Sequence, residues 1–263
     1  EACSPKFFSI TVGRLEDVGM TYSSSMICGH RGAAEKFPEN SLAAFDAAHQ
    51  MGVGAIETDI QMLADGELVL FHDERLGRTT AGDGIITDLR WSDIEGLDIG
   101  SWKAKRFSDQ RPVRMADLVD WQLSVRATPN IIWEMKLSPD ASETRIFDAA
   151  QAVGRQLDGL APDRHCLTSF NRTFIRYVRP LLPKIPMALA SVEFPEDWKT
   201  FCQLHKLQAL HLDGSLLTED QAMRVKDAGL QLRCYTINDP ELAERLFDWG
   251  VDMIFTDSPD IFI

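Results

Sequence analysis

The sequence predicts an α/β fold in which eight parallel strands alternate with helices and close into a (β/α)8 TIM barrel. Strand-like apolar runs alternate with helix-like runs along almost the whole chain, and eight strands is the number that closes such a barrel. The length of 263 residues is also close to the ~250 typical of this fold. A doubly wound open sheet is the alternative, but the GxGxxG turn of its dinucleotide-binding members does not follow the first strand.

The expected strands are short apolar runs bounded by turn-forming residues. They lie at 26–30, 54–62, 130–136, 165–170, 185–190, 208–213, 231–237 and 252–256. The expected helices lie between them, at 40–51, 115–126, 141–157, 171–181, 197–206, 218–228 and 239–249. The first helix has the clearest signals, because Asn40 is a candidate N-cap and Gly52 a C-terminal stop. Pro240 suits the first turn of the last helix.

The segment between the second and third barrel strands is far longer than a simple crossover. Ala64-Asp65-Gly66-Glu67 is a two-residue hairpin signal, so a strand at 67–71 should pair antiparallel with the second barrel strand. This turn places His72 directly opposite Asp59 on the same face, and a bulge would shift the register by one residue. Residues 73–112 are rich in Gly, Thr, Asp, Arg and Trp, and we expect a small insertion over one barrel mouth.

One barrel domain is expected over residues 26–263, with the insertion inside it. Residues 1–25 lack the basic start and continuous apolar core of a signal peptide. We therefore treat them as a leader without an assigned role, in part an added or processed piece, and place the native start near Met20 or Met26. No run approaches the ~18 apolar residues that a membrane span requires.

Charge and cysteine content limit the partners and the compartment. The net charge of −13 argues against a broad surface for nucleic acid or anionic membranes. The five cysteines show no CxxC spacing, which favours reduced structural thiols in a cytoplasmic protein over a disulfide framework. A periplasmic or secreted location and a homo-oligomeric state both stay open.

Polar pairs lie toward the ends of four expected barrel strands. They are Glu57 and Asp59, Glu134 and Lys136, Ser169 and Asn171, and Thr236 and Asn238. Residues two apart on a strand face the same side, and barrel active sites lie at the carboxyl ends of the strands. We therefore expect these side chains to gather at one mouth, although polar residues at strand ends also serve as caps and turns.

Three carboxylates, Glu57, Asp59 and Glu134, should converge from neighbouring strands. They cannot all stay ionised in a confined site without a cation or a shared proton. Oxygen ligands alone favour a hard divalent ion, either Mg²⁺ or Ca²⁺. Arg31 can bind two phosphate oxygens at once, and Lys136 can supply a further positive charge. This combination suits a metal-assisted reaction on a phosphate ester.

Two histidines can flank the same centre. His30 ends the first strand, and His72 follows the hairpin. One imidazole can withdraw a proton from the nucleophile while the other protonates the leaving alkoxide. The other four histidines lack such neighbours and are expected to be structural or exposed, although His211 can also approach the site from its barrel strand.

In order and spacing, a set of motifs from about Ile27 to Pro259 resembles the glycerophosphodiester phosphodiesterases, relatives of the phosphatidylinositol-specific phospholipase C barrels. The motifs are His30-Arg31-Gly32, Pro38-Glu39-Asn40-Ser41, Glu57-Thr58-Asp59, Asp65-Gly66, His72-Asp73, Arg78-Thr79-Thr80, Glu134-x-Lys136, Ser169-Phe170-Asn171 and Thr256-Asp257-Ser258-Pro259. The resemblance implies a (β/α)8 barrel with an insertion after the second strand and a role in lipid metabolism. The site residues it implies are His30 and His72 as acid and base, Glu57, Asp59 and Glu134 as metal ligands, and Arg31 and Lys136 on the phosphate.

Four further residues are candidates for the substrate pocket, namely Glu39, Phe170, Asn171 and Tyr235. Glu39 equally suits a helix N-terminus, and the two aromatic residues equally suit core packing. The chain departs from the family pattern at Ser41, where Thr is commoner. It departs again at Tyr235-Thr236-Ile237-Asn238, where Trp-Thr-Val-Asn is usual, and this second change bears on substrate choice.

The expected activity is cation-dependent hydrolysis of a small-molecule glycerophosphodiester to sn-glycerol 3-phosphate and an alcohol. Either water attacks directly, or the glycerol 2-hydroxyl attacks first and forms a cyclic phosphate. One alternative is a lysophospholipase D-type enzyme, which needs an apolar groove near the insertion. The other is a non-catalytic barrel that binds phosphate sugars, for which a histidine acid/base pair would serve no purpose.

Overall fold

Eight parallel strands close into a barrel in the computed structural model, which describes residues 22–263. The ring is closed because the first strand pairs with both the second and the last. The barrel strands are β1 (Ile27–His30), β2 (Ala55–Met62), β4 (Asn130–Met135), β5 (His165–Ser169), β6 (Met187–Ser191), β7 (Ala209–Asp213), β8 (Gln231–Tyr235) and β9 (Met253–Thr256). The predicted (β/α)8 barrel and its eight strands are confirmed.

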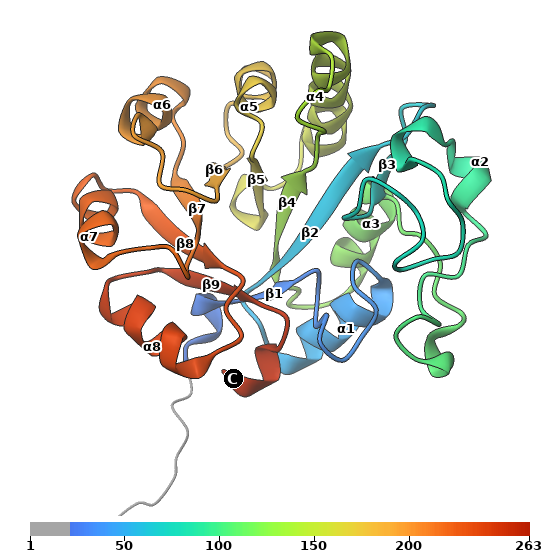
Figure 1. Cartoon of the computed structure of the whole chain (residues 1–263), viewed down its shortest axis with the longest axis horizontal. Helices are drawn as coiled ribbons and strands as arrows, with labels where there is room; N and C mark the ends of the chain where they lie inside the picture. Colours follow the sequence, from blue (N-terminus) through green and yellow to red (C-terminus); the bar gives the residue numbers. More distant parts are fainter. Residues whose placement is uncertain (1–21) are drawn as a thin grey trace, which may run out of the picture.

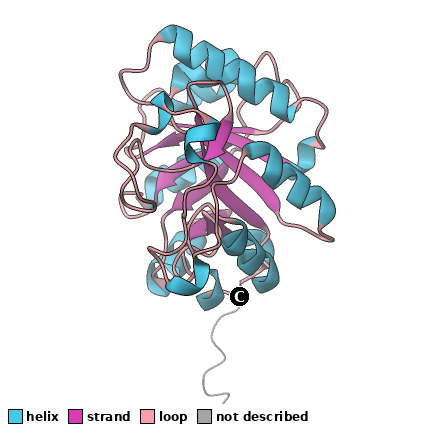
Figure 2. Ribbon diagram, turned by 90° about the vertical axis from the view of Figure 1, so that its right-hand side faces the viewer, coloured by secondary structure: helices cyan, strands magenta, loops and turns pink. Residues whose placement is uncertain are grey.

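Helices surround the strands on the outside of the barrel (Figures 1 and 2). They are α1 (Leu42–Met51), α3 (Met115–Ser124), α4 (Glu143–Leu157), α5 (Arg172–Val178), α6 (Trp198–His205), α7 (Glu219–Asp227) and α8 (Pro240–Asp248), with a short α2 (Trp91–Ile94) in the insertion. Short 3-10 turns are η1 (Ser24–Met26), η2 (Ile86–Asp88), η3 (Lys105–Phe107), η4 (Pro162–Arg164) and η5 (Pro259–Ile261). The seven predicted helices are all present.

Alternation along the strands builds two cores. The larger core lies between strands and helices and includes Ile56, Trp133 and Leu210. The smaller core lies inside the barrel, where Cys28 pairs with Ala55 on one side and Phe255 on the other. At the carboxyl ends of the strands, the residues that face the interior are polar. The barrel interior therefore ends in a polar site at the carboxyl mouth.

The N-terminus of the first helix differs from the prediction. Ser41, and not Asn40, is the N-cap of α1, since its hydroxyl accepts a hydrogen bond from the Ala44 N–H at 3.2 Å. Asn40 instead has a left-handed backbone with φ of 55° and turns its side chain inward. Gly52 ends the helix with φ of 86°, and Pro240 lies in the first turn of α8, as expected.

The predicted hairpin is present, but its predicted register is wrong. β3 (Leu68–Leu70) pairs antiparallel with β2, and Met62 lies opposite Leu68. The turn contains three residues, because the Leu63 N–H donates to the Glu67 carbonyl at 2.8 Å and Gly66 adopts a φ of 87°. This extra residue moves every pair by one position. The backbone partner of Asp59 is accordingly Phe71, and His72 does not lie directly opposite it.

The segment at 73–112 packs against the β2–β3 hairpin beside the barrel, where Figure 1 shows α2 next to β3. Its apolar residues form a small separate core with side chains of the hairpin. The buried members of this core are Leu63, Val69, Phe71, Ile86 and Ile94. Trp91 packs against this core, whereas the Trp102 side chain is 38% exposed.

The first and last described segments meet at one side of the barrel. The Tyr22 N–H donates to the Phe262 carbonyl at 3.1 Å, and the Tyr22 ring lies 4.7 Å from that of Phe247. Residues 1–21, most of the expected leader, fall outside the described residues. Between residues 22 and 263, all four cysteines are buried and free, and no helix is long and apolar enough to cross a membrane.

Candidate active site

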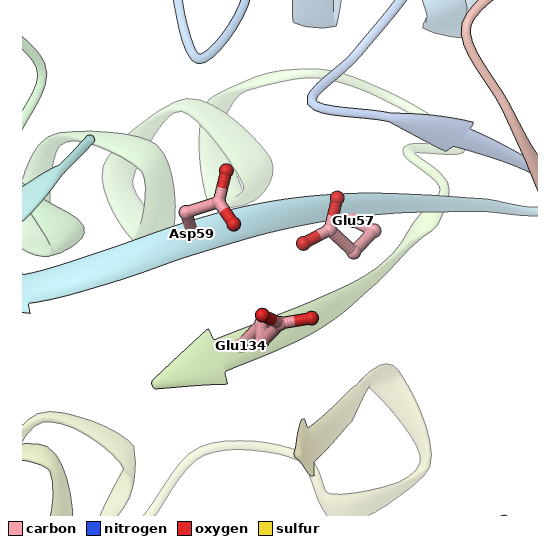
Figure 3. Close-up of side chains that lie close together, drawn as sticks. All are labelled: Glu57, Asp59 and Glu134. Atoms are coloured by element: carbon pink, nitrogen blue, oxygen red, sulfur yellow. The ribbon is translucent and has the colours of Figure 1, made fainter. Parts of the chain in front are cut away.

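Three carboxylates lie together at the carboxyl mouth of the barrel (Figure 3). Glu57 and Asp59 come from β2, and Glu134 comes from β4, where it pairs with Asp59. One oxygen from each residue lies within 4.8 Å of the others, and all three side chains are buried. The structure therefore brings together the three predicted metal ligands.

The negative charges of these carboxylates repel one another. Burial, and then the charges of Asp59 and Glu134, raise the pKa of Glu57 well above its usual range. Its Oε1 atom is buried without a hydrogen-bond partner within residues 22–263. A buried, unpartnered oxygen beside two further carboxylates is the donor set of a hard divalent cation. The residues present thus fit such an ion.

Asp59 is the best neutralised of the three. Arg31 Nε lies 3.1 Å from Oδ2, and Lys136 Nζ lies 3.3 Å from Oδ1 and also contacts Glu134. Burial alone would raise the pKa of Asp59, but these two cations lower it below its usual range. In turn, the carboxylates raise the pKa of Lys136 against the effect of burial. Asp59 and Lys136 are therefore both charged at neutral pH.

Arg31 is held at the mouth by its backbone and its side chain. Its φ is 55°, its N–H donates to Glu57 Oε2 at 3.1 Å, and its guanidinium donates to Glu39 at 2.9 Å. The next residue, Gly32, has φ of 88°, and a Cβ there would lie 2.6 Å from the Ala44 backbone. Only glycine allows this tight turn between β1 and α1.

His30 is tied to a carboxylate from the far end of the chain. Its Nδ1 lies 2.7 Å from Asp257 Oδ1, and its Nε2 lies 3.9 Å from Glu57 Oε2. Burial would raise the pKa of Asp257, but the hydrogen bond with His30 lowers it. An ionised carboxylate only accepts hydrogen bonds, so the proton lies on Nδ1 and Nε2 faces the carboxylate cluster.

His72 has the same arrangement with its neighbour in sequence. Its Nδ1 lies 2.8 Å from Asp73 Oδ1, and the side chain is 33% exposed. Burial would raise the pKa of Asp73, but hydrogen bonds from Arg78 and then His72 lower it. Asp73 is therefore an acceptor, and Nδ1 of His72 carries the proton. When protonated, His72 and then His30 also lower the pKa of Asp59, after the larger effects of Arg31 and Lys136.

Two residues of the site were not assigned to it from the sequence, where Asn40 was expected only as a helix cap. Asp257 orients His30, and Asn40 donates from Nδ2 to Asp59 Oδ2 at 2.9 Å while its Oδ1 accepts from the Thr58 hydroxyl at 2.7 Å. Both residues lie in motifs that carry the family resemblance. Their place in those motifs was the signal that could have found them. Their partners, His30 for Asp257 and Asp59 for Asn40, are not close to them in sequence.

The candidate pocket residues occupy different parts of the mouth. Phe170 is 41% exposed, and its ring lies 5.9 Å from that of Tyr235 and 5.6 Å from Lys136 Nζ. Asn171 caps α5, because its Oδ1 accepts from the Phe174 N–H at 2.9 Å. Glu39 binds the two guanidinium groups of Arg31 and Arg78. Phe170 is thus the exposed aromatic side chain beside the cationic Lys136.

His211 does not join this cluster. It is buried inside the barrel against Phe255, with ring centroids 5.0 Å apart, and burial holds its pKa well below the usual range.

A cavity of about 560 Å³ lies at the opposite mouth, lined by strand-start residues such as Ala55, Asn130 and Gln231. The carboxylates and histidines therefore form a site separate from this cavity.

Sequence comparison matches this chain with one family. The model described as "Glycerophosphoryl diester phosphodiesterase family" matches residues 30–261. A glycerophosphodiester phosphodiesterase of Bacillus subtilis (strain 168) is 29% identical over 245 residues, which cover 89% of this chain and 83% of the relative. That of Caldanaerobacter subterraneus subsp. tengcongensis is 27% identical over 246 residues, covering 91% and 96%.

Structure comparison agrees with this match. A phosphodiesterase from Oleispira antarctica, solved in complex with the product sn-glycerol-3-phosphate, superposes with a TM-score of 0.82 at 28% sequence identity. The match covers 89% of this chain and 94% of that one. The family match thus includes the insertion, and the structural match covers most of the chain.

Proposed function

This chain belongs to the glycerophosphoryl diester phosphodiesterase family, and we propose that it hydrolyses glycerophosphodiesters to sn-glycerol 3-phosphate and an alcohol. The observation that carries the proposal is a pair of imidazoles beside three buried carboxylates. Each imidazole has its Nδ1 bound to an aspartate. The relative from Oleispira antarctica, which was solved with that product, supports the choice of substrate class.

Glu57, Asp59 and Glu134 would hold one divalent cation, Mg²⁺ or Ca²⁺. Their all-oxygen donor set and the unpartnered Glu57 Oε1 support this assignment. When bound, the cation polarises the phosphate and offsets its developing negative charge. Arg31 and Lys136 would hold the remaining phosphate oxygens, since both cations lie beside Asp59 at the same mouth.

His30 and His72 would move the protons. With Nδ1 occupied by Asp257 or Asp73, each ring has Nε2 available to take a proton from the nucleophile or give one to the leaving alkoxide. The nucleophile is either water or the glycerol 2-hydroxyl. Replacing either histidine by Ala should lower kcat roughly 10²–10⁴-fold, which is the usual scale of acid/base catalysis.

Substrate assays test the proposal directly. Glycerophosphocholine and lysophosphatidylcholine should be compared with Mg²⁺ and with Ca²⁺, with release of choline and sn-glycerol 3-phosphate as the readout. Preferred cleavage of the first substrate supports the proposal, and preferred cleavage of the second indicates the lysophospholipase D alternative. Binding without turnover with either ion would refute both. Phosphorus NMR during turnover identifies a cyclic phosphate, if one forms, by its separate resonance.

A further inference from the structure

Arg78, from the insertion, makes a dense set of ionic hydrogen bonds at the edge of the site. Its Nε donates to Asp73 Oδ2 at 2.6 Å, and its Nη2 donates to Asp73 Oδ1 at 2.9 Å. On the other side, Nη1 and Nη2 donate to the two oxygens of Glu39, each at 2.7 Å. One guanidinium thus binds two carboxylates, each through both oxygens.

Both carboxylates lead to residues of the proposed reaction. Asp73 accepts a hydrogen bond from Nδ1 of His72. Arg78 therefore holds the carboxylate that orients this imidazole. Glu39 also accepts from Arg31, whose Nε lies beside Asp59. The Glu39 side chain is only 10% exposed and therefore offers Arg78 a rigid anchor.

A neighbouring arginine shows what an ordinary surface pair looks like in the same segment. Arg75 pairs with Asp83, a side chain that is 94% exposed, and the Arg75 side chain itself is 54% exposed. Such pairs contribute little to stability or geometry. Arg78 differs because its two partners are largely buried and each contacts a further residue of the site. Its guanidinium fork suits this geometry, whereas the single ammonium of a lysine does not.

We propose that Arg78 is a positioning residue that holds Asp73 so that His72 keeps its proton on Nδ1 and presents Nε2 to the substrate. This inference rests on the proposed function of His72 and adds a role for the insertion. In this role Arg78 acts through Asp73 and not on the substrate, because its guanidinium donors are bound to Asp73 and to the anchoring Glu39.

Arg78→Ala should lower kcat for glycerophosphocholine roughly 10- to 100-fold, by analogy with the loss when a group that orients a metal-binding histidine is removed. KM should change less than about threefold, because Arg31 and Lys136 stay in place to bind phosphate. Arg78→Lys should recover only part of the loss, and added guanidinium ion should partly rescue Arg78→Ala. Arg75→Ala is the matched control and should behave like the wild type.

A double variant separates positioning from other roles. In the His72→Ala background, Arg78→Ala should cause little further loss, because residues that act through one another are not additive. Fully additive losses, or a rise in KM with kcat unchanged, would overturn the proposal.

A second readout does not depend on activity. Ring ¹⁵N NMR should show His72 with its proton on Nδ1 in the wild type and a mixture of tautomers in Arg78→Ala, while His30 keeps its tautomer. An unchanged His72 tautomer refutes the role of Arg78 even in an active enzyme. An inactive wild type with the expected tautomer shift would instead refute the proposed function alone.

Discussion

At the scale of single residues, both imidazoles are bound by an aspartate at Nδ1. Asp73 is the sequence neighbour of His72, whereas Asp257 is separated from His30 by 227 positions. Asp257 is itself held, because its Oδ2 accepts from Asn238 Nδ2 at 2.9 Å and its N–H donates to Asn238 Oδ1 at 2.8 Å. The His30 tautomer therefore depends on a carboxylate whose orientation is set by two further hydrogen bonds.

Asp257→Asn should lower kcat at least about tenfold, with an upper bound near the 10⁴-fold loss known for the aspartate of a serine protease triad. An amide at this position can donate to His30 Nδ1 and so favour the wrong tautomer. Steady-state kinetics with glycerophosphocholine measures the effect. Asp260→Asn is a suitable control, since this nearby aspartate pairs with the exposed Lys36. Equal kcat for Asp257→Asn and wild type would contradict the assignment.

At the scale of elements, one residue in a turn decides the register of the hairpin. The three-residue turn needs Gly66 in the left-handed region, and a Cβ at that position would meet no heavy atom within 4 Å. A substitution there is thus a test of backbone strain alone. Register matters here because it decides whether His72 or Phe71 is the backbone partner of Asp59.

Gly66→Ala should destabilise the protein by about 1 kcal/mol, the lower end of the cost of a left-handed backbone for an L-residue. Urea unfolding at fixed pH and ionic strength measures this difference. Gly96→Ala is the matched control, because a Cβ at Gly96 also meets open space and its φ does not fall in the positive region. Equal destabilisation by the two substitutions would argue against turn strain as the cause.

A second element-scale feature links β4 to β5. Trp133 Nε1 donates to His165 Nδ1 at 3.2 Å, so the imidazole must be neutral to accept this bond. Burial, and then the charge of Arg164, lower the pKa of His165 from 6.5 to about 4. The unfolded chain therefore binds a proton at a higher pH than the folded protein does.

Stability should consequently fall as the pH drops from about 6.5 to about 4, and this contribution should level off at lower pH. Its size is on the order of 2–3 kcal/mol for a largely buried imidazole. His165→Gln keeps an acceptor for Trp133 but does not titrate, so its urea-unfolding free energy should fall less over this range. If wild type and variant lose the same free energy between pH 6.5 and 4, His165 is not responsible.

At the scale of the whole molecule, the site places mutually repelling charges inside the barrel. The raised pKa of Glu57 means that its ionised form destabilises the fold at neutral pH. A divalent cation that binds only the folded state reverses this cost by mass action, adding about 2.7 kcal/mol at a hundredfold excess over Kd. Function and stability are thus opposed in the metal-free protein.

Adding Mg²⁺ or Ca²⁺ at that excess should raise the Tm of the wild type by about 5–10 °C. Glu57→Gln should lose this shift, yet in EDTA it should unfold at or above the wild-type Tm, because the substitution removes a buried charge. Calorimetric titration with each ion provides a readout that needs no turnover. Glu244→Gln, an exposed helical position, should keep the wild-type response. A metal-dependent Tm shift that persists in Glu57→Gln would exclude Glu57 as a ligand.

Much of this protein was predictable from the sequence because the relevant signals are local. The alternation of residues along a strand places Glu57 and Asp59 on one face, and the same spacing places Glu134 and Lys136 together on the next barrel strand. Eight such strands with intervening helices predict a barrel, and a barrel predicts a site at the carboxyl mouth. Gly52 and Pro240 mark helix ends through their own backbone preferences.

Only the tertiary structure decided the contacts between distant segments. Barrel closure sets β9 beside β1, and this alone brings Asp257 to His30. Likewise, the left-handed turn at Asn40 directs its side chain to Asp59, and the insertion carries Arg78 to Glu39. The reason is physical. Strand periodicity and helix caps depend on residues that are close in sequence. These hydrogen bonds instead join loops that are far apart in sequence, and only the completed barrel brings those loops together.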